Sequence, residues 1–221
     1  GIPNLFSVPY PTSLHPTSIV EMAAWVKLVS SRQRRYFSSL LTGPPRHNRE
    51  DIVAECRRSN DCRHLWLGGR GYGPLGKCKS DCILSTYMNS TFCIQPPGDS
   101  ATRRGFFDSL IAGCIPIIFS RDMGNYLWYT PLDILLQIAL LTHSLTEALT
   151  RARLMSQDEL EMRRSAIKSL IPRVVYSGCF PGDAFDTGLR GLRFSRADVI
   201  RSQALQSTTK TWERRDDRLR Q

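Results

Sequence analysis

The sequence predicts an α/β fold with a mainly parallel sheet flanked by helices. Apolar runs of strand length alternate along the chain with segments whose apolar residues recur at helical spacing. Residues 91–119 read as a strand, a turn, a helix and a second strand, which is a complete βαβ unit. The 221 residues are enough to bury a substantial core.

The individual elements follow from local signals. Residues 1–17 are rich in proline and predict an extended connector. Ser18 is expected to cap a helix that runs through Val29, and Ser156 a helix over 156–171. The first helix should bury one face, made of Ile19, Met22, Ala23, Val26 and Val29. The other expected strands are 36–41, 63–69, 91–94 and 115–119, and the other expected helices are 49–59, 80–90 and the one before Gly113.

The chain is basic, with 30 Lys and Arg against 20 Asp and Glu and a net charge of +10. This balance favours an anionic partner such as a phosphate, an acidic polysaccharide, a membrane surface or nucleic acid, or else a solvated basic surface. The tail 190–221 alone carries nine Lys and Arg and four Asp and Glu. The most apolar stretch, "LDILLQIALL", is too short and too polar to predict a membrane span.

The seven cysteines indicate two environments. Cys93 and Cys114 lie beside apolar runs and are expected to be small buried core residues. Cys56, Cys62, Cys78 and Cys82 cluster in a turn-prone region, with a spacing that is poor for structural zinc. One or two disulfides in an oxidising lumen are expected, with Cys62–Cys78 as the first pairing; free thiols are the alternative.

The turn "PPGDSATRR" places Arg103 and Arg104 at the start of a helix. A helix N-terminus has unpaired N–H groups and partial positive charge, so it attracts phosphate, and in open α/β sheets ligands bind at this edge. Two guanidiniums there become favourable when a diphosphate neutralises them. The alternative is structural: Asp99 or Ser100 caps the helix, and Arg104 and Asp108 form a surface pair.

The segment "FCIQPPGDSATRRGFFDSLIAGCIP" closely resembles the signature of exostosin-family glycosyltransferases, in particular the plant-type branch that includes xyloglucan galactosyltransferases. Weaker resemblances, such as "SSLLTGPPR" and "ECRRSNDCR", flank this segment and occur in the same order as in the family. The resemblance therefore covers most of residues 7–190. It implies the Rossmann-like, donor-binding C-terminal lobe of a GT-B glycosyltransferase. The domains are then an inter-lobe connector and helix (1–30), the nucleotide-sugar-binding lobe (31–189) and a basic tail (190–221).

The resemblance also implies a donor site. The residues that would hold the UDP diphosphate are Gly98, Ser100, Thr102, Arg103 and Arg104. Asp108 occupies the acidic position associated with the ribose, and Arg46 is a second phosphate contact. No catalytic residue is assigned, because the general base commonly comes from an N-terminal lobe outside this chain.

The implied activity is inverting transfer of a sugar, above all galactose, from a UDP-sugar to a polysaccharide or glycoprotein glycan in the Golgi lumen. The chain opens on Gly1 without an initiator Met and is expected to be part of a type II membrane protein whose anchor lies elsewhere. No cofactor or metal is expected, and no Asp-x-Asp pair occurs. The alternatives are a truncated, non-catalytic nucleotide-sugar-binding module and a polyanion-binding protein; nucleic acid is not expected as a partner, since no nucleic-acid motif is present.

Overall fold

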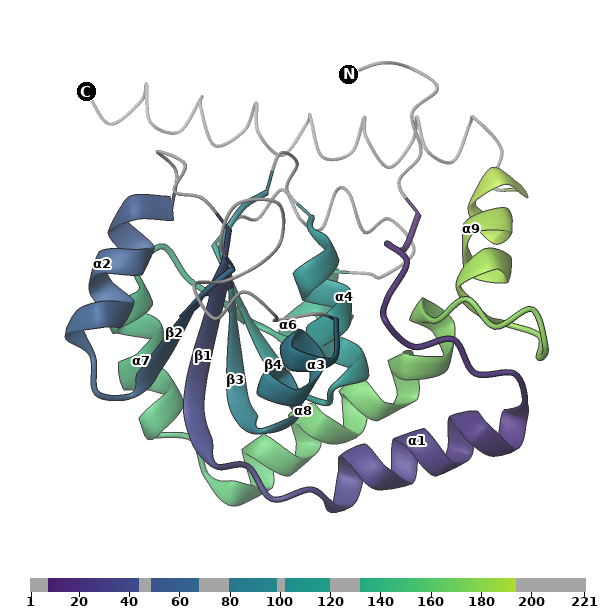
Figure 1. Ribbon diagram of the computed structural model, residues 1–221, viewed down its shortest axis with the longest axis horizontal. Coiled ribbons are helices and arrows are strands. Elements are labelled where there is room, and N and C mark those ends of the chain that lie inside the picture. The colour runs from purple at the N-terminus through teal and green to yellow at the C-terminus, as the bar shows by residue number, and fades with distance from the viewer. Residues whose placement is uncertain (1–7, 44–48, 68–79, 99–101, 120–131, 194–221) are drawn as a thin grey trace, which may run out of the picture.

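The computed structural model describes residues 8–43, 49–67, 80–98, 102–119 and 132–193. They contain a five-stranded, all-parallel sheet in the order β2-β1-β3-β4-β5 (Figure 1). The strands are β1 (Tyr36–Thr42), β2 (Cys62–Trp66), β3 (Ser90–Gln95), β4 (Ile115–Ile118) and β5 (Leu140–Leu141). The helices are α1 (Ile19–Ser31), α2 (Glu50–Arg58), α3 (Ser80–Met88), α4 (Arg104–Ile111), α6 (Leu132–Ile138), α7 (Leu145–Arg153), α8 (Gln157–Leu170), the 3-10 helix η3 (Ile171–Val174) and α9 (Ala184–Arg193).

The predicted α/β class with a parallel sheet is confirmed, and the fold is consistent with a Rossmann-like GT-B lobe. From β1 the chain continues to β2 on one side of the sheet and to β3 on the other, so the strand order reverses between β1 and β3. Ligands of open parallel sheets bind at the carboxyl ends of the strands at such a switch point. The topology therefore marks the end of β1 and the end of β3 as the place to look for a site.

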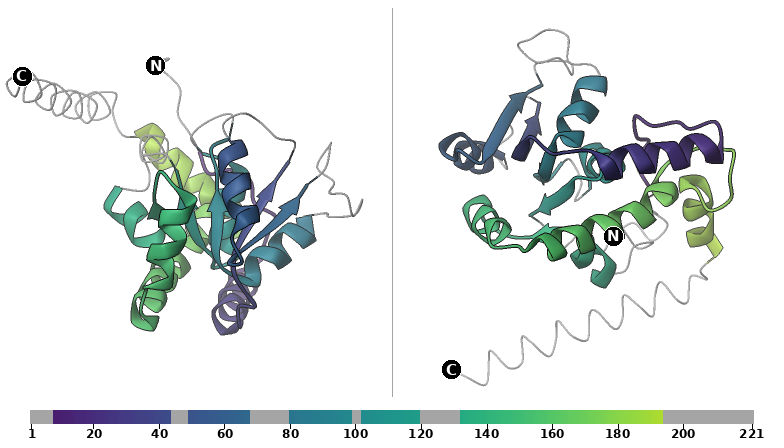
Figure 2. Two further views of the ribbon diagram at one scale, coloured as in Figure 1. Left: turned by 90° about the vertical axis from the view of Figure 1, so that its left-hand side faces the viewer. Right: turned by 90° about the horizontal axis from the view of Figure 1, so that it is seen from below.

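Helices pack on the sheet and on one another. Helix α2 contacts β2 and α7, whereas α3 and α4 contact each other and β3. Helix α1 contacts α8 and runs beside it (Figure 2, right). Among the described residues, no helix is both long and apolar enough to cross a bilayer.

Helix α4 packs its apolar side chains into the core. Four apolar side chains of this helix are at most 2% exposed and lie in the core cluster with β3 and β4: Phe106, Phe107, Leu110 and Ile111. Every residue of α4 after Arg104 is buried. Helix α4 is therefore fixed in the centre of the lobe, and Arg104 is its exposed residue.

Three helices begin with the same capping arrangement. The side chains of Ser18, Ser144 and Ser156 each accept a hydrogen bond from the backbone N–H of the glutamate three residues later. The predicted caps at Ser18 and Ser156 are confirmed.

The expected buried face of α1 is partly wrong. Met22 and Val29 are buried, but Ile19 is 67% exposed and Ala23 is also exposed. The packed face of α1 instead includes Trp25, whose indole Nε1 donates to the Ile111 carbonyl at 2.8 Å. This contact rotates α1 away from the pattern that aliphatic spacing alone suggested.

The disulfides correct two expectations. Cys62 bonds to Cys56, not to Cys78, because the chain turns back after α2 and brings the two Cα atoms to 5.1 Å. Cys93 and Cys114 are buried as expected, but they form a disulfide with each other between β3 and the residue before β4. Strands β3 and β4 are neighbouring parallel strands, so Cys93 and Cys114 lie side by side although they are 21 residues apart in the sequence. Cys82 is disulfide-bonded as well.

The amino-terminal edge of the sheet is held by one side chain. The Arg34 guanidinium donates to five backbone carbonyls at 2.8–3.4 Å, and among the described residues no carboxylate pairs with it. These carbonyls belong to Val29, Tyr87, Met88, Ser90 and Gly113. Val29 lies in the last turn of α1, Tyr87 and Met88 end α3, and Gly113 follows α4. Helix C-terminal carbonyls carry partial negative charge, so three helix ends surround this cation.

Gly113 gives the first test of this packing. Its φ is +63°, and a Cβ atom there would lie 2.4 Å from Val29 Cγ1 and 2.9 Å from Arg34 Nη2. We expect Gly113→Ala to lower the free energy of unfolding by about 2–5 kcal/mol, combining the left-handed backbone cost with overpacking. The measurement is urea denaturation followed by circular dichroism.

The matched control is Gly178→Ala. Gly178 has nearly the same φ of +64°, but a Cβ atom at this position would have no described atom within 4 Å. The variant should lose only the backbone contribution of about 1–2 kcal/mol. Equal losses in the two variants would show that Gly113 is not packed against Val29 and Arg34.

Candidate functional site

The carboxyl ends of β1 and β3 are joined by two arginines. Arg103, between β3 and α4, donates from Nη2 to the Leu41 carbonyl of β1 at 3.3 Å. Arg49, at the start of α2, donates from Nε to the Pro97 carbonyl just after β3 at 2.8 Å. Basic side chains therefore bridge the two strands at the switch point.

The start of α4 differs from the capped helices. Its N-cap residue is Arg103, whose side chain makes no capping hydrogen bond, and its first turn has no acidic residue. Asp99 and Ser100, the alternative caps, lie outside the described residues. Arg103 gives the first N–H groups of α4 no side-chain cap, and the positive end of the helix dipole is reinforced by Arg104.

Behind this turn lies a buried polar cluster. A Cβ atom on Gly105 would lie 2.8 Å from Gln95 Oε1, 3.1 Å from Arg103 Nε and 3.2 Å from Tyr87 Oη, so only glycine leaves room for these three atoms. Gln95 Nε2 donates to Tyr87 Oη at 3.1 Å. Burial raises the pKa of the Tyr87 hydroxyl, although the Arg103 charge and the Gln95 hydrogen bond oppose the shift.

Two atoms of this cluster have unused hydrogen-bonding capacity. Arg103 Nη1 and Gln95 Oε1 are buried and have no hydrogen-bond partner in the described structure. Buried polar groups normally find partners, so each is a position where a ligand or water would complete the arrangement.

Arg104 and Asp108 form an ion pair that is not confined to the surface. Arg104 Nε lies 3.2 Å from Asp108 Oδ2; the arginine side chain is 52% exposed, but the aspartate side chain is only 3% exposed. Ser13 of the connector donates its backbone N–H to Asp108 Oδ1 at 3.2 Å, and Arg104 Nη2 donates to Ser13 Oγ at 2.8 Å. Burial raises the pKa of the Asp108 carboxyl, opposed by Arg104 and by the hydrogen bonds from Ser13 and Arg104.

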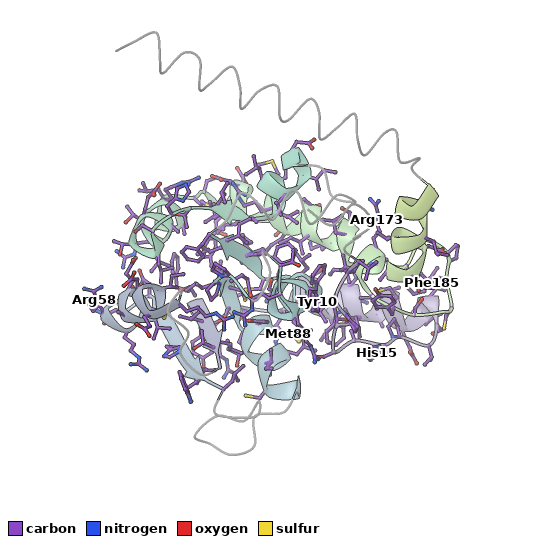
Figure 3. The ribbon with its side chains drawn as sticks, turned by 90° about the horizontal axis from the view of Figure 1, so that it is seen from above. Tyr10, His15, Arg58, Met88, Arg173 and Phe185 are labelled. Atoms are coloured by element: carbon purple, nitrogen blue, oxygen red, sulfur yellow. A yellow bond between two sulfur atoms is a disulfide. The ribbon has the colours of Figure 1, made fainter. Side chains whose placement is uncertain are left out.

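This pair docks the connector on α4. The ring of Tyr10 lies 5.9 Å from that of Phe107, and Tyr176 Oη donates to the Pro9 carbonyl at 2.7 Å. Figure 3 shows Tyr10 and His15 on this side of the molecule, with Arg58 of α2 at the opposite end. Both carboxylate oxygens of Asp108 are engaged by the connector and Arg104, and its assignment to the ribose stays a prediction.

The other predicted site residues fall into two groups. Thr102 is buried next to Arg103, and Gly98 is half-buried after β3, so both flank the turn that leads to α4. Ser100 and Arg46 lie outside the described residues. In the described part of the chain, no group of three His, Cys, Asp or Glu side chains is arranged to hold a metal.

Sequence reasoning missed four side chains near this edge: Tyr87, Gln95, Thr42 and His64. Gln95 had a readable signal, because it is a polar residue at the end of an apolar strand. Tyr87 had none, since an aromatic residue in an amphipathic helix reads as core.

His64 is held in one neutral form. Its Nδ1 accepts from Arg57 Nε at 3.4 Å, and its Nε2 lies 2.9 Å from Thr42 Oγ1 at the end of β1. A guanidinium only donates, so Nδ1 carries no proton and Nε2–H donates to Thr42. Burial lowers the pKa of His64, and the Arg57 charge lowers it further.

Comparison with known proteins gives a consistent result. The Exostosin GT47 domain matches residues 3–137. A probable xyloglucan galactosyltransferase of Arabidopsis thaliana, GT12, is 35% identical over 215 residues, covering 83% of this chain and 38% of the relative. The xyloglucan galactosyltransferase MUR3 of the same plant is 32% identical over 192 residues, covering 79% of this chain and 29% of the relative. The chain thus spans well under half the length of these two relatives.

The lowered pKa of His64 predicts that the free energy of unfolding depends on pH. Its folded pKa is depressed, so the unfolded chain takes up a proton at a higher pH, near 6.5, than the folded chain does. The contribution is fully present above that value and is lost as pH falls through the folded pKa, at no more than about 1.4 kcal/mol per pH unit for one group. His64→Gln should flatten the decline between pH 7 and 5.

The control for this experiment is His143→Gln, at an exposed histidine. It should leave the slope of unfolding free energy against pH, measured by urea titration, as it is in the unmodified chain. A His64→Gln slope equal to that of the unmodified chain would contradict the buried neutral form.

Proposed function

The chain belongs to the exostosin GT47 family, and from this premise we propose that it is the donor-binding part of a glycosyltransferase that uses a UDP-sugar. The acceptor is proposed to be a polysaccharide of the xyloglucan type and the transferred sugar galactose, in line with the names of the relatives. The observation that carries the proposal is the basic start of α4, formed by Arg103 and Arg104, at the switch point of a parallel sheet.

The geometry supports a diphosphate at this position. The first N–H groups of α4 and the two guanidiniums supply positive charge on one short turn, and Arg103 Nη1 is a buried donor without a partner among the described residues. Because the turn is anchored to β1 through the Leu41 carbonyl, these donors are positioned before the ligand arrives.

In the proposed reaction, an acceptor hydroxyl oxygen attacks the anomeric carbon of the donor from the face opposite the diphosphate. The new glycosidic C–O bond forms as the bond between that carbon and the diphosphate oxygen breaks, which inverts the anomeric configuration. The hydroxyl proton passes to a general base, and UDP leaves with the bonding electrons. Arg103, Arg104 and the start of α4 stabilise the negative charge that develops on UDP.

The cysteines support a lumenal location as part of this proposal. Cys56–Cys62 and Cys93–Cys114 are disulfide-bonded, and such bonds persist in oxidising compartments. We place the protein in the Golgi lumen on this ground and on the resemblance to its family, with any membrane anchor outside the described residues.

Arg104→Ala tests donor binding. We expect the affinity for UDP to fall at least about tenfold, since a charge-assisted hydrogen bond contributes about 1.5–3 kcal/mol. The measurement is isothermal titration calorimetry with UDP at fixed ionic strength.

The matched control is Arg58→Ala, which removes the same charge from α2. Arg58 is exposed, and its Nε donates to the Ala54 carbonyl one turn earlier at 3.3 Å. UDP affinity should not change in this variant. Unchanged UDP binding in Arg104→Ala would refute the donor site, whereas an equal loss in both variants would reduce the effect to overall charge.

A further inference from the structure

A second basic site lies at the opposite edge of the sheet. A shallow cleft, open to solvent, lies between the end of α1, the segment that leads into β1, the turn after α4, and α8. It is lined by Val29, Ser30, Arg32, Arg34, Gly113, Arg164 and Lys168. Four of these seven residues are basic and none is acidic.

The four cations differ in how they are satisfied. Arg34 donates to the five carbonyls already described, and Lys168 Nζ donates to Glu161 Oε1 at 2.9 Å. Arg32 and Arg164 have no hydrogen bond or ion pair to any described residue. Two guanidiniums, the exposed one of Arg32 and the half-buried one of Arg164, therefore line the cleft without a carboxylate partner among the described residues.

Arg164 gives the sharper indication. Its Nε is buried and has no hydrogen-bond partner in the described structure. Such an atom has lost its water without gaining an acceptor, which is unfavourable unless something else enters. Arg34 responds to the same excess of charge: burial lowers its pKa to about 10, and the charges of Arg164 and Arg32 act in the same direction.

We propose that this cleft binds a tetrahedral oxyanion with two negative charges, a phosphate or sulfate group. A dianion would neutralise Arg32 and Arg164, and the planar fork of a guanidinium matches its oxygens. Lys168 adds a third, point-like donor. The site stands on its own residues and does not depend on the proposed transfer reaction, whose donor site lies at the other edge.

Two sources of this chemistry are possible, a free ion and an ester group carried on a sugar. Calorimetric titrations with inorganic phosphate and with glucose 6-phosphate, at an ionic strength fixed with sodium chloride, separate them. Saturable binding of either probe supports the site, and tighter binding of the sugar phosphate identifies an ester as the ligand. The absence of saturable binding by both probes overturns it.

Variants assign the binding to one edge. In titrations that contain saturating UDP, so that the proposed donor site is already filled, Arg164→Gln should weaken phosphate binding at least about tenfold, whereas Arg104→Ala should leave it unchanged. The opposite pattern would place the ion at the start of α4 and overturn the proposal. A loss of the same size in Arg58→Gln, at an exposed arginine of α2, would reduce it to general charge screening.

The melting temperature distinguishes a ligand-binding role of Arg164 from a structural one. Without added phosphate, Arg164→Gln should unfold at the same temperature as the unmodified chain or a higher one, because it removes an unpartnered charge beside Arg34. Phosphate should raise the melting temperature of the unmodified chain but not that of Arg164→Gln. A clearly lowered melting temperature of Arg164→Gln in phosphate-free buffer would mean that Arg164 holds the fold, not a ligand.

Discussion

The amino-terminal end of the sheet depends on a half-buried cation that is stabilised by backbone carbonyls instead of a carboxylate. Arg34 joins the ends of α1 and α3, the start of β3 and the turn after α4. Each of these carbonyls would otherwise lack a partner where a helix stops or a strand begins. Because one planar group serves all of them, the position of α4 is set from its C-terminal end, and its first turn is presented at the carboxyl edge in a fixed place.

The two edges of the sheet use arginine in different ways. At the amino edge the Arg34 guanidinium donates to five carbonyls. Arg32 and Arg164 line the same cleft without a hydrogen bond or ion pair to a described residue. At the carboxyl edge Arg103 divides its guanidinium between the Leu41 carbonyl and an unpartnered Nη1, while Arg104 is shared by Asp108 and Ser13. A ligand at Arg104 would therefore compete with the connector, so occupancy of the site and docking of residues 8–17 are linked energetically.

The sequence predicted most of what local chemistry determines. The βαβ unit of residues 91–119, the serine caps at Ser18 and Ser156 and the alternation of strands and helices all follow from spacing and side-chain type. The prediction failed where partners come from distant segments, as in the pairing of Cys93 with Cys114 and the rotation of α1 onto Ile111. Helix α7 was missed although Ser144 and Glu147 have the Ser-x-x-Glu spacing of a helix start, and Ser144 caps this helix. The cluster of Gln95, Tyr87 and Arg103 could not be found without knowing that three elements meet at Gly105.

The Cys93–Cys114 bond closes a ring of chain that contains all but the first and the last two residues of the motif, from within β3 through the turn and α4 to the residue before β4. A covalent ring of about this size removes roughly 3 kcal/mol of chain entropy from the unfolded state. The turn proposed to bind the donor thus belongs to a covalent ring that is closed between β3 and the residue before β4. Production of this protein in a reducing cytoplasm would yield a chain with an open ring, and the loss would concentrate on the one segment that carries the family signature.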